Sequence, residues 1–325
     1  MKRWLGFAVP VFAAALVLGA CGTTETPAPE GSANAGGPVT VTDSRGKEIK
    51  LSAPARKVVS LEWGETEMLV SLGVMPVGAA DTKGFAAWVG AVKLDPSVKD
   101  VGTRNEPSVD SIVALQPDLV VMEAERDSAL VPQLEKFVPV IVTKGSDASR
   151  NIERMREDFN LIATAVGKTE QAKNVLADFD SAIATAKQTL ASKGAAGKQF
   201  VMADGWKEGS TVNIRMFGQG ALVSQLGIQI GLKNAWNGKV DEVWGLGATD
   251  VEGLSSIKDT DLRFLYNASE GEDVFVNGLA GNPIWESFTF VKNKQVHKNP
   301  NGIWTFGGPA SGKQFIDNLV KVFSA

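Results

Sequence analysis

The chain has 325 residues and a formal net charge of −4, from 33 Lys and Arg against 37 Asp and Glu. This length exceeds one typical hydrophobic core and predicts two domains. The acidic balance, without basic runs, argues against a nucleic-acid partner. The single histidine, His297, and the single tyrosine, Tyr266, leave too few ligands for a zinc or manganese site, so we expect no protein-held metal.

The first residues are typical of an export signal. Lys2 and Arg3 precede an apolar run that ends at Leu18, and "LGAC" ends at Cys21, the only cysteine. A run of this length could nearly span a bilayer, so a retained anchor helix is the alternative. The cysteine directly after the run resembles a bacterial lipobox and favours cleavage before Cys21 and lipidation of that residue. We therefore predict a signal peptide over residues 1–20 and a mature chain anchored by lipid to the extracytoplasmic face of the cell membrane.

Residues 21–38 are small, polar and proline-bearing, without apolar periodicity, which predicts a flexible tether. From residue 39 to about 145, short apolar runs alternate with helical patterns. The expected strands are "KVVSL", "PVGAA", "DLVVM" and "VPVIVT", and the expected helices are "ETEMLVSLG", "VDSIVAL" and "ALVPQLEKF". Continuous apolar strands separated by helices indicate a mostly parallel sheet covered on both faces.

Two longer helices follow. Apolar residues recur at spacings of three and four before Gly167, and a second stripe runs from Thr169 to Lys193 and ends at Gly194. At 1.5 Å per residue the second helix would be roughly 36 Å long, enough to bridge two lobes. Strand and helix patterns then alternate again to the last, amphipathic helix. The sequence predicts an α/β fold of two α/β lobes with mostly parallel sheets, over residues 39–168 and 194–325, joined by a single long helix over residues 169–193.

Five features carry a resemblance to a known family: the lipobox, "VVSL…ETEMLVSLGVMPVG", "VGTRNEPSVDSIVALQPDLVV", the long connecting helix and "VKNKQVHKNPNGIWTFGGP". Over residues 39–325 the chain resembles the substrate-binding proteins of ABC importers for ferric siderophores and vitamin B12. The resemblance implies a monomeric binding protein, not an enzyme, which holds its ligand between two lobes that flex little and delivers it to an ABC permease dimer. It implies no permanently bound cofactor. Two alternatives remain. The ligand could be cobalamin or haem in place of a ferric siderophore, and the partner could be a sensor in place of the permease.

Large aromatic residues concentrate after the expected strands, where open α/β sheets place their ligands. The candidates for ligand contact are Trp63, Phe85, Trp88, Trp206, Phe217, Trp244, Trp304 and Phe306. Phe85 and Trp88 are expected in a long loop, whereas Trp236 and Trp285 are expected in the core. Arg104 and Arg215 are expected on opposite lobes, and their guanidinium groups suit oxygen-rich ligands, although either alone could be a solvated surface arginine.

The ligand class follows from what these residues can hold. With one histidine and one tyrosine in the chain, iron must arrive already chelated, and the protein must grip an organic surface. Two arginines are few for a strongly anionic catecholate complex, so a neutral or cationic hydroxamate siderophore is expected. Hydroxamate binders of the family commonly place a tyrosine beside the arginine, and here only Tyr266 could supply it.

A phrase at residues 108–122, "SVDSIVALQPDLVVM", has an echo at residues 250–266, "DVEGLSSIKDTDLRFLY". Each carries a carboxylate just inside an expected helix start, Asp110 and Glu252. The resemblance implies that acids at these positions dock onto permease arginines. Because the family usually has Glu in the first lobe, Glu106 is a third candidate. The alternative is helix stabilisation, since Thr249 and Glu252 have the spacing of a capping box.

Overall fold

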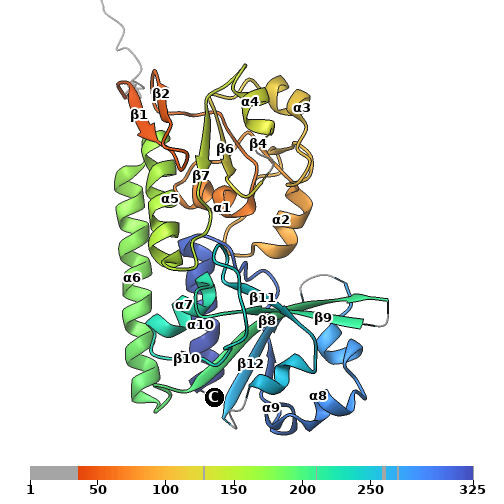
Figure 1. Ribbon diagram of the computed structural model, residues 1–325. Helices are drawn as coiled ribbons and strands as arrows, with labels where there is room; N and C mark the ends of the chain where they lie inside the picture. Colours follow the sequence, from red (N-terminus) through yellow and green to blue (C-terminus); the bar gives the residue numbers. More distant parts are fainter. Residues whose placement is uncertain (1–35, 127–128, 210, 258–260, 269–270, 325) are drawn as a thin grey trace, which may run out of the picture. The chain divides into compact units, whose positions relative to one another are not determined.

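The N-terminal lobe is built on a five-stranded parallel sheet with strand order β5-β4-β3-β6-β7. The computed structural model describes residues 36–324 except 127–128, 210, 258–260 and 269–270, and the described part forms one compact unit (Figure 1). The predicted signal peptide, the lipidation site Cys21 and the tether up to residue 35 lie outside the described residues.

In the N-terminal lobe the strands β3, β6 and β7 are buried along their whole length, as their continuous apolar sequences predict. An antiparallel ribbon, β1 and β2, precedes the sheet. The strands are β1 Val39–Thr42, β2 Glu48–Leu51, β3 Val58–Ser60, β4 Gly78–Ala79, β5 Lys99–Asp100, β6 Leu119–Glu123 and β7 Val140–Thr143. The helices are α1 Trp63–Ser71, α2 Thr82–Trp88, α3 Val109–Ala114 and α4 Leu130–Leu134.

Helix α2 corrects one expectation, because Phe85 and Trp88 lie on a helix and not in a long loop. The side chain of Asp81 caps this helix by accepting a hydrogen bond from the Gly84 amide at 3.0 Å. Seven residues are too few to show a clear helical period in the sequence.

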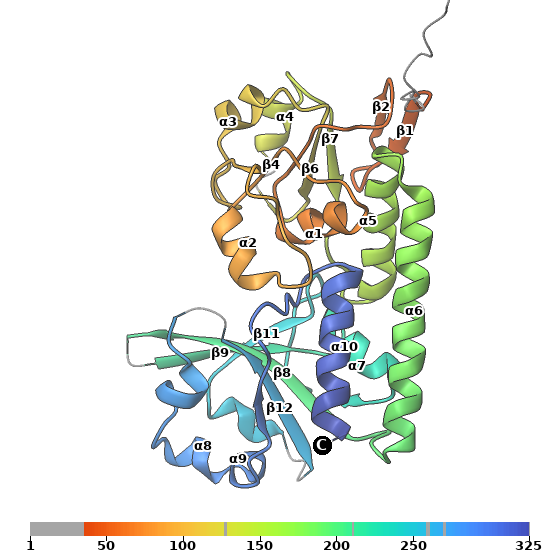
Figure 2. The ribbon, with the colours of Figure 1, turned by 180° about the vertical axis from the view of Figure 1, so that it is seen from behind.

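Two helices connect the lobes. Helix α5, Asn151–Ala165, turns at Gly167, which has a φ of 67°, into α6, Thr169–Ser192. Helix α6 packs with one face against α5 towards its start and against the C-terminal helix α10 towards its end, and Figure 2 shows it running along both lobes. Its buried side chains are Ala172, Phe179, Ala186 and Leu190, which form one stripe.

The C-terminal lobe has a mixed sheet with strand order β11-β9-β8-β12-β13, and β10 also pairs with β8. Strands β10 and β12 run parallel to β8, and β13 runs parallel to β12, whereas β8–β9 and β9–β11 are antiparallel. The expectation of a mostly parallel sheet is therefore accurate for the N-terminal lobe but incomplete for this one. The strands are β8 Gln199–Glu208, β9 Thr211–Phe217, β10 Lys233–Asn234, β11 Leu246–Thr249, β12 Leu262–Asn267 and β13 Val296–Lys298.

The helices of this lobe are short apart from α7 and α10. The segment "VEGLSSI" forms a 3₁₀ turn, Gly253–Ser256, and not an α-helix, and a π-helical turn covers Val274–Gly278. Trp236 and Trp285 are buried in the core of this lobe, as predicted. The helices are α7 Leu222–Gln229, α8 Pro283–Ser287, α9 Thr289–Lys292 and α10 Pro309–Ser324.

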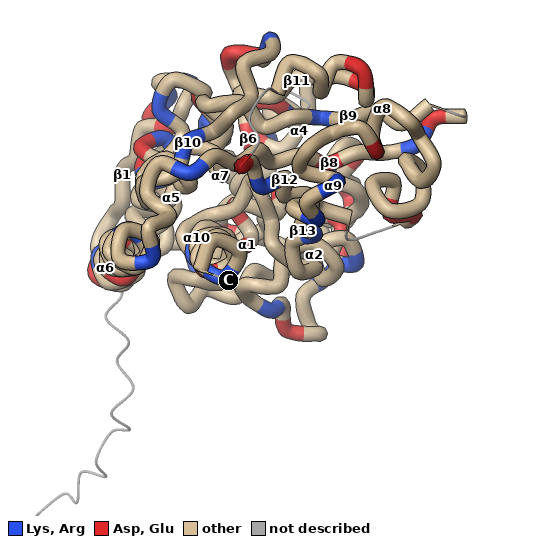
Figure 3. The backbone as a smooth tube through the Cα atoms, turned by 90° about the horizontal axis from the view of Figure 1, so that it is seen from below, with Lys and Arg blue, Asp and Glu red and all other residues tan. Residues whose placement is uncertain are grey.

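One hydrophobic core runs through both lobes behind the cleft. It includes Phe159 of α5, Phe179 of α6, Phe200 of β8 and Phe315 of α10, all fully buried. Acidic and basic positions are interspersed along the backbone (Figure 3). The shared core fixes the lobes against each other and leaves their facing loops to form a site.

Candidate ligand-binding site

A cavity of about 340 Å³ lies where the loops of the two lobes meet. The N-terminal lobe contributes the residues that follow β3, β5 and β6, and the C-terminal lobe contributes β9, β11 and the loop before α10. This position, beyond the C-terminal ends of parallel strands, is where open α/β sheets bind ligands. We call it the outer cavity, and its lining residues are Glu62, Arg104, Glu123, Glu125, Arg126, Arg215, Trp244, Leu246, Trp304 and Phe306.

On the N-terminal side, one carboxylate holds two arginines. Glu62 is the N-cap of α1 and accepts a hydrogen bond from the Trp63 amide at 2.8 Å. Its Oε1 also accepts from Nη1 of Arg104 at 2.8 Å, and its Oε2 accepts from Nε of Arg126 at 2.6 Å. The Glu62 side chain is only 5% exposed, so this bridge is well shielded from solvent. The bridge fixes both guanidinium groups at the cavity wall.

Aromatic rings support this bridge. The guanidinium carbon of Arg104 lies 3.6 Å from the ring centroid of Trp63 and 5.5 Å from that of Trp304. The rings of Trp63 and Trp304 meet edge to face at 4.9 Å, and Trp88 meets Trp304 at 6.1 Å. A cation over an aromatic face is held by the ring quadrupole as well as by its ion pair, so the orientation of Arg104 is doubly determined.

The C-terminal side repeats the arrangement with one arginine. Arg215 of β9 lies opposite Asp204 of β8 in the antiparallel register, and its Nε donates to Asp204 Oδ1 at 2.9 Å. Burial raises the pKa of Asp204, and the charge of Arg215 opposes that rise. The Arg215 guanidinium carbon is 5.5 Å from the ring of Phe306, which meets Trp244 edge to face at 5.3 Å.

The structure brings five of the predicted ligand residues together at the outer cavity: Arg104, Arg215, Trp244, Trp304 and Phe306. The others lie around it. Phe85 and Phe217 are almost fully buried, Trp63 is 4% exposed, and Trp88 is partly exposed beside Trp304, so these rings support the wall from behind. Direct contact of these four with a ligand stays a prediction.

Trp206 occupies a different position, towards the tip of the β8–β9 hairpin. It stands two residues beyond Asp204 on the same strand, so the two side chains share a face of β8. Trp206 is 47% exposed and does not line the outer cavity. Its contact with a ligand also stays a prediction.

Sequence reasoning missed four charged residues of the wall: Glu62, Glu123, Glu125 and Arg126. A signal for two of them was present. Glu62 closely follows β3 and Glu123 ends β6, and these strands are parallel neighbours in the sheet. Because the carboxyl ends of adjacent parallel strands meet at one edge, the two glutamates were candidates for a shared site.

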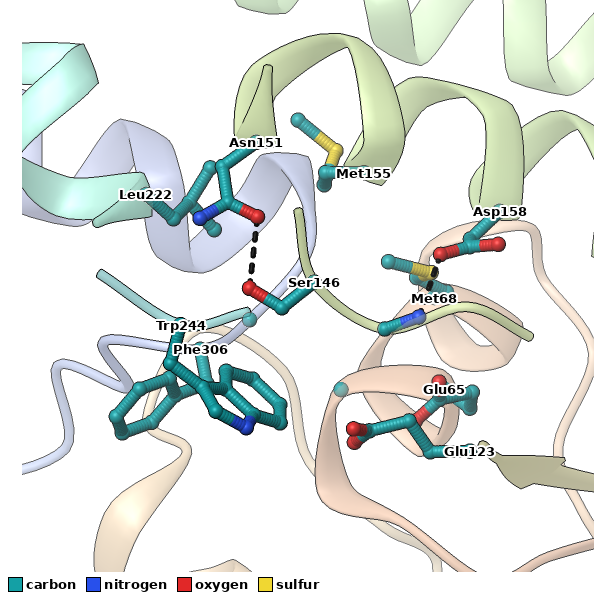
Figure 4. Close-up of a pocket in the computed structure, with 13 residues that line it drawn as sticks. Glu65, Met68, Glu123, Ser146, Asn151, Met155, Asp158, Leu222, Trp244 and Phe306 are labelled. Atoms are coloured by element: carbon teal, nitrogen blue, oxygen red, sulfur yellow. Dashed lines mark hydrogen bonds between the residues drawn. The ribbon is translucent and has the colours of Figure 1, made fainter. Parts of the chain in front are cut away.

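A second, smaller cavity of about 20 Å³ lies beside the outer cavity and shares Glu123, Trp244 and Phe306 with it (Figure 4). We call it the inner chamber. Its polar lining residues are Glu65, Glu123, Ser146, Asn151 and Asp158. Burial and the nearby charge of Glu62 raise the pKa of Glu65 to about 8, and burial with the charge of Glu65 raises the pKa of Glu123 well above its ordinary value.

The remaining candidates for ligand chemistry lie away from the outer cavity. Tyr266 is 3% exposed, and its hydroxyl donates to Asp273 Oδ2 at 3.2 Å, so it does not stand beside an arginine of the wall. His297 lies on β13 next to Gln295. Within the described residues, no group of three or more His, Cys, Asp or Glu side chains is arranged to hold a metal ion. The described helices include none that combines the length and the apolar character needed to cross a membrane.

The predicted docking acids are all exposed. Asp110 lies in the first turn of α3, where the side chain of Ser108 forms the cap to the Ser111 amide at 3.2 Å. Before the 3₁₀ turn, the cap is Asp250, which accepts from the Gly253 amide at 2.9 Å.

Glu252 makes no side-chain capping bond, and Thr249 donates to the Asp250 carbonyl. The capping-box interpretation of Thr249 and Glu252 is therefore wrong. Glu106 is likewise exposed, and among the described residues none of the three acids forms an ion pair.

Comparison with known proteins finds relatives in sequence and in structure. The chain is 27% identical over 271 residues to the iron(3+)-hydroxamate-binding protein FhuD of Escherichia coli, covering 81% of this chain and 86% of the relative. It is 28% identical over 309 residues to the Fe(3+)-citrate-binding protein YfmC of Bacillus subtilis, covering 95% and 93%.

Among solved structures, the Fe3+-Desferal-bound siderophore-binding protein FhuD of Vibrio cholerae superposes with a TM-score of 0.71 at 22% identity, covering 83% of this chain and 98% of that one. This likeness confirms the predicted two-lobe α/β fold with its long helix. Residues 58–301, three quarters of the chain, match the model of one family: the chain belongs to the periplasmic binding protein family.

Proposed function

We propose that this protein is a lipid-anchored extracytoplasmic solute-binding protein that captures a ferric siderophore of the hydroxamate type and delivers it to an ABC permease. The family match and the names of the relatives, which include binders of ferric hydroxamates and of ferric citrate, support the general class. The lipobox at Cys21 supports the anchor.

The balance of charges in the outer cavity is the observation that favours a hydroxamate siderophore over an anionic chelate. Three guanidinium groups line it, but Arg104 and Arg126 share Glu62, and Arg215 is paired with Asp204. Two further carboxyl groups, those of Glu123 and Glu125, also border the cavity. The carboxylates of Glu62, Asp204 and exposed Glu125 balance the three guanidinium groups, so the wall has no excess of positive charge, and Glu125 would repel a multiply charged anionic chelate.

A neutral or cationic ferric hydroxamate meets none of this repulsion. Guanidinium N–H groups that are not used in the ion pairs can donate to the hydroxamate oxygens around the iron. The rings of Trp244, Trp304 and Phe306 can pack against the aliphatic linkers of the chelate. The iron needs no ligand from the protein, because the siderophore fills its coordination sphere.

Titration of intrinsic tryptophan fluorescence tests the assignment. The panel is a ferric trihydroxamate, ferric citrate, a ferric triscatecholate, haem and cobalamin, each with its iron-free or metal-free counterpart where one exists. The trihydroxamate should quench at one ligand per chain, because Trp244 and Trp304 lie at the cavity and the chelate absorbs near-ultraviolet light. Saturable quenching by ferric citrate or the catecholate alone would contradict the hydroxamate assignment. A response to haem or cobalamin alone would contradict the assignment of a ferric siderophore as the ligand.

Delivery to a permease rests on one exposed acid of each lobe, Asp110 and Glu252. Asp110 and Glu252 are exposed, and neither caps its helix through its side chain, so both carboxylates are available to a basic partner. A sensor protein could use the same cavity without these contacts. The charge-reversal experiment in the Discussion distinguishes the two partners.

A further inference from the structure

The carboxyl group of Glu123 stands on the wall that separates the outer cavity from the inner chamber. The residue is 4% exposed, and its Oε1 is buried without a hydrogen-bond partner among the described residues. It fits there because Gly145 has no side chain, since a Cβ at that position would lie 2.4 Å from Glu123 Cδ. A buried polar atom without a partner indicates a bound species that satisfies it.

The neighbouring acids already have partners for their negative charge. From α1, Glu62 is paired with Arg104 and Arg126. From α5, Asp158 accepts from Arg154 Nη2 at 2.8 Å and from the backbone amides of Lys144 and Gly145 at 3.1 and 3.0 Å.

The other groups around Glu123 complete the set. Glu125, from the loop after β6, is exposed to solvent. The residues that close the chamber from the C-terminal lobe, Leu222, Trp244, Phe306 and Gly307, carry no titratable group. Among the described residues, Glu65 of α1 and Glu123 of β6 are therefore the two carboxyl groups of the chamber without an ion-pair partner, although the charge of Arg126 opposes the rise in the pKa of Glu123.

The hydrogen bonds of Thr143 on β7 indicate the state of Glu65. Thr143 Oγ1 lies 2.5 Å from Glu65 Oε1 and 3.2 Å from the carbonyl oxygen of Met122. A hydroxyl has one proton, and both neighbours accept if Glu65 is ionised. If Glu65 carries a proton, it donates to Thr143, and the Thr143 proton serves the Met122 carbonyl, so every group is satisfied.

We propose that the inner chamber is a proton-binding site, in which Glu65 and Glu123 hold a proton together with one water molecule, and that ligand binding in the outer cavity is linked to this proton. The chamber volume of about 20 Å³ matches a single water, which can donate to the free oxygen of Glu123. The pKa values of both groups, raised by burial, agree with a proton that is held at neutral pH.

The direction of the linkage follows from desolvation. A neutral chelate in the outer cavity removes water from the wall at Glu123 and further disfavours its ionised form. Binding then takes up protons wherever the pair is partly ionised, and the affinity falls as the pH rises through that range, by at most about tenfold per pH unit for one proton. This part of the inference rests on the proposed function, whereas the proton site itself does not.

The ligand-free test is infrared spectroscopy of the whole protein in D₂O. We expect a C=O stretching band of protonated carboxyl groups at neutral pH, which weakens in Glu65→Gln and in Glu123→Gln and is unchanged in the control Glu125→Gln. Both substitutions preserve side-chain shape, and titration of the wild-type band from pH 6 to 10 provides the same readout if a variant does not fold. Absence of this band in the wild-type protein at pH 7 would overturn the proton site.

The ligand test measures the affinity for a neutral ferric trihydroxamate from pH 6 to 9.5 and the proton uptake by calorimetry in two buffers of different ionisation enthalpy. The wild-type affinity should fall severalfold as the pH rises above about 8, the raised pKa of Glu65, with net proton uptake. Glu65→Gln and Glu123→Gln should show flatter profiles, whereas Glu106→Gln, at an exposed residue outside the outer cavity, should keep the wild-type profile. A pH-independent wild-type affinity without proton uptake would overturn the linkage. If the infrared band is present but no ferric chelate binds, the proton site would be supported and the proposed function would be refuted.

Discussion

Glu67 of α1 and Ser311 of α10, 244 residues apart in the chain, form a fully buried link between the lobes. Glu67 Oε1 accepts from the Ser311 amide at 2.9 Å and Oε2 accepts from the Ser311 hydroxyl at 2.5 Å. The carboxyl group thus stands at the N-terminus of a 16-residue helix. Burial raises the pKa of Glu67, and the hydrogen bonds from Ser311 oppose this rise.

The first prediction concerns this link. Ser311→Ala should lower the free energy of unfolding by about 1–3 kcal/mol, because it leaves one carboxyl oxygen of Glu67 buried without the hydroxyl donor. Chemical denaturation measures the loss. The control is Ser256→Ala, because Ser256 is exposed and its side chain makes no hydrogen bond to the described residues. Equal stability of both variants would show that Glu67 finds another partner.

The pH dependence of stability is the second prediction. Because the folded pKa of Glu65 is raised to about 8, the folded state binds more protons than the unfolded state above pH 4.5. Stability contributed by the neutral carboxyl group is therefore fully present below the unfolded value and is lost as the pH rises towards 8. Denaturation midpoints measured from pH 5 to 8 should fall less steeply in Glu65→Gln than in the wild-type protein. A steeper fall in the variant would contradict this sign.

A third prediction concerns the arginines of the cavity. Arg104→Ala should weaken binding of a ferric trihydroxamate about ten- to a hundredfold, through the loss of charge-assisted hydrogen bonds worth about 1.5–3 kcal/mol. Arg215→Ala alone would leave the buried carboxylate of Asp204 without its ion-pair partner, so this substitution is combined with Asp204→Asn. Unchanged affinity in Arg104→Ala and in the Arg215→Ala, Asp204→Asn variant would remove both arginines from the site.

The fourth prediction uses Glu62 to change specificity. Glu62→Gln removes the anion that compensates Arg104 and Arg126, so two guanidinium charges become available in the cavity. Anionic chelates such as ferric citrate should then bind at least several times more tightly, whereas exposed Glu106→Gln, the matched control, should not change their affinity. Competition between ferric citrate and a ferric trihydroxamate gives the ratio directly. A ratio equal to that of the wild-type protein would contradict the charge argument.

Docking to a permease is the subject of the fifth prediction. The double variant Asp110→Lys, Glu252→Lys should keep its ligand affinity and thermal midpoint, because neither side chain forms a cap or an ion pair within the described residues. Uptake of iron by cells that depend on this protein should fail, since like charges would then face the permease. Normal uptake with the folded double variant would favour a sensor or another docking surface.

The alternating strands and helices, the turn glycines at 167 and 194 and the long helix between them could be predicted from the sequence, because each depends on local pattern and conformation. The β8–β9 hairpin was predictable in part, since Val212, Ile214 and Met216 alternate inward along β9. The bridge between Glu62 and Arg126 was not, because 64 residues separate them and only the sheet brings them together.

The two lobes share one hydrophobic core, and helix α6 packs along both of them. This arrangement affects how a permease could distinguish ligand-bound from ligand-free protein. Because both lobes share this core, we expect ligand binding to change the spacing between Asp110 and Glu252 very little. A permease that measured only this spacing could not tell a loaded carrier from an empty one, and empty carriers would occupy it as inhibitors. Transport should therefore slow when unloaded protein is in excess over its siderophore.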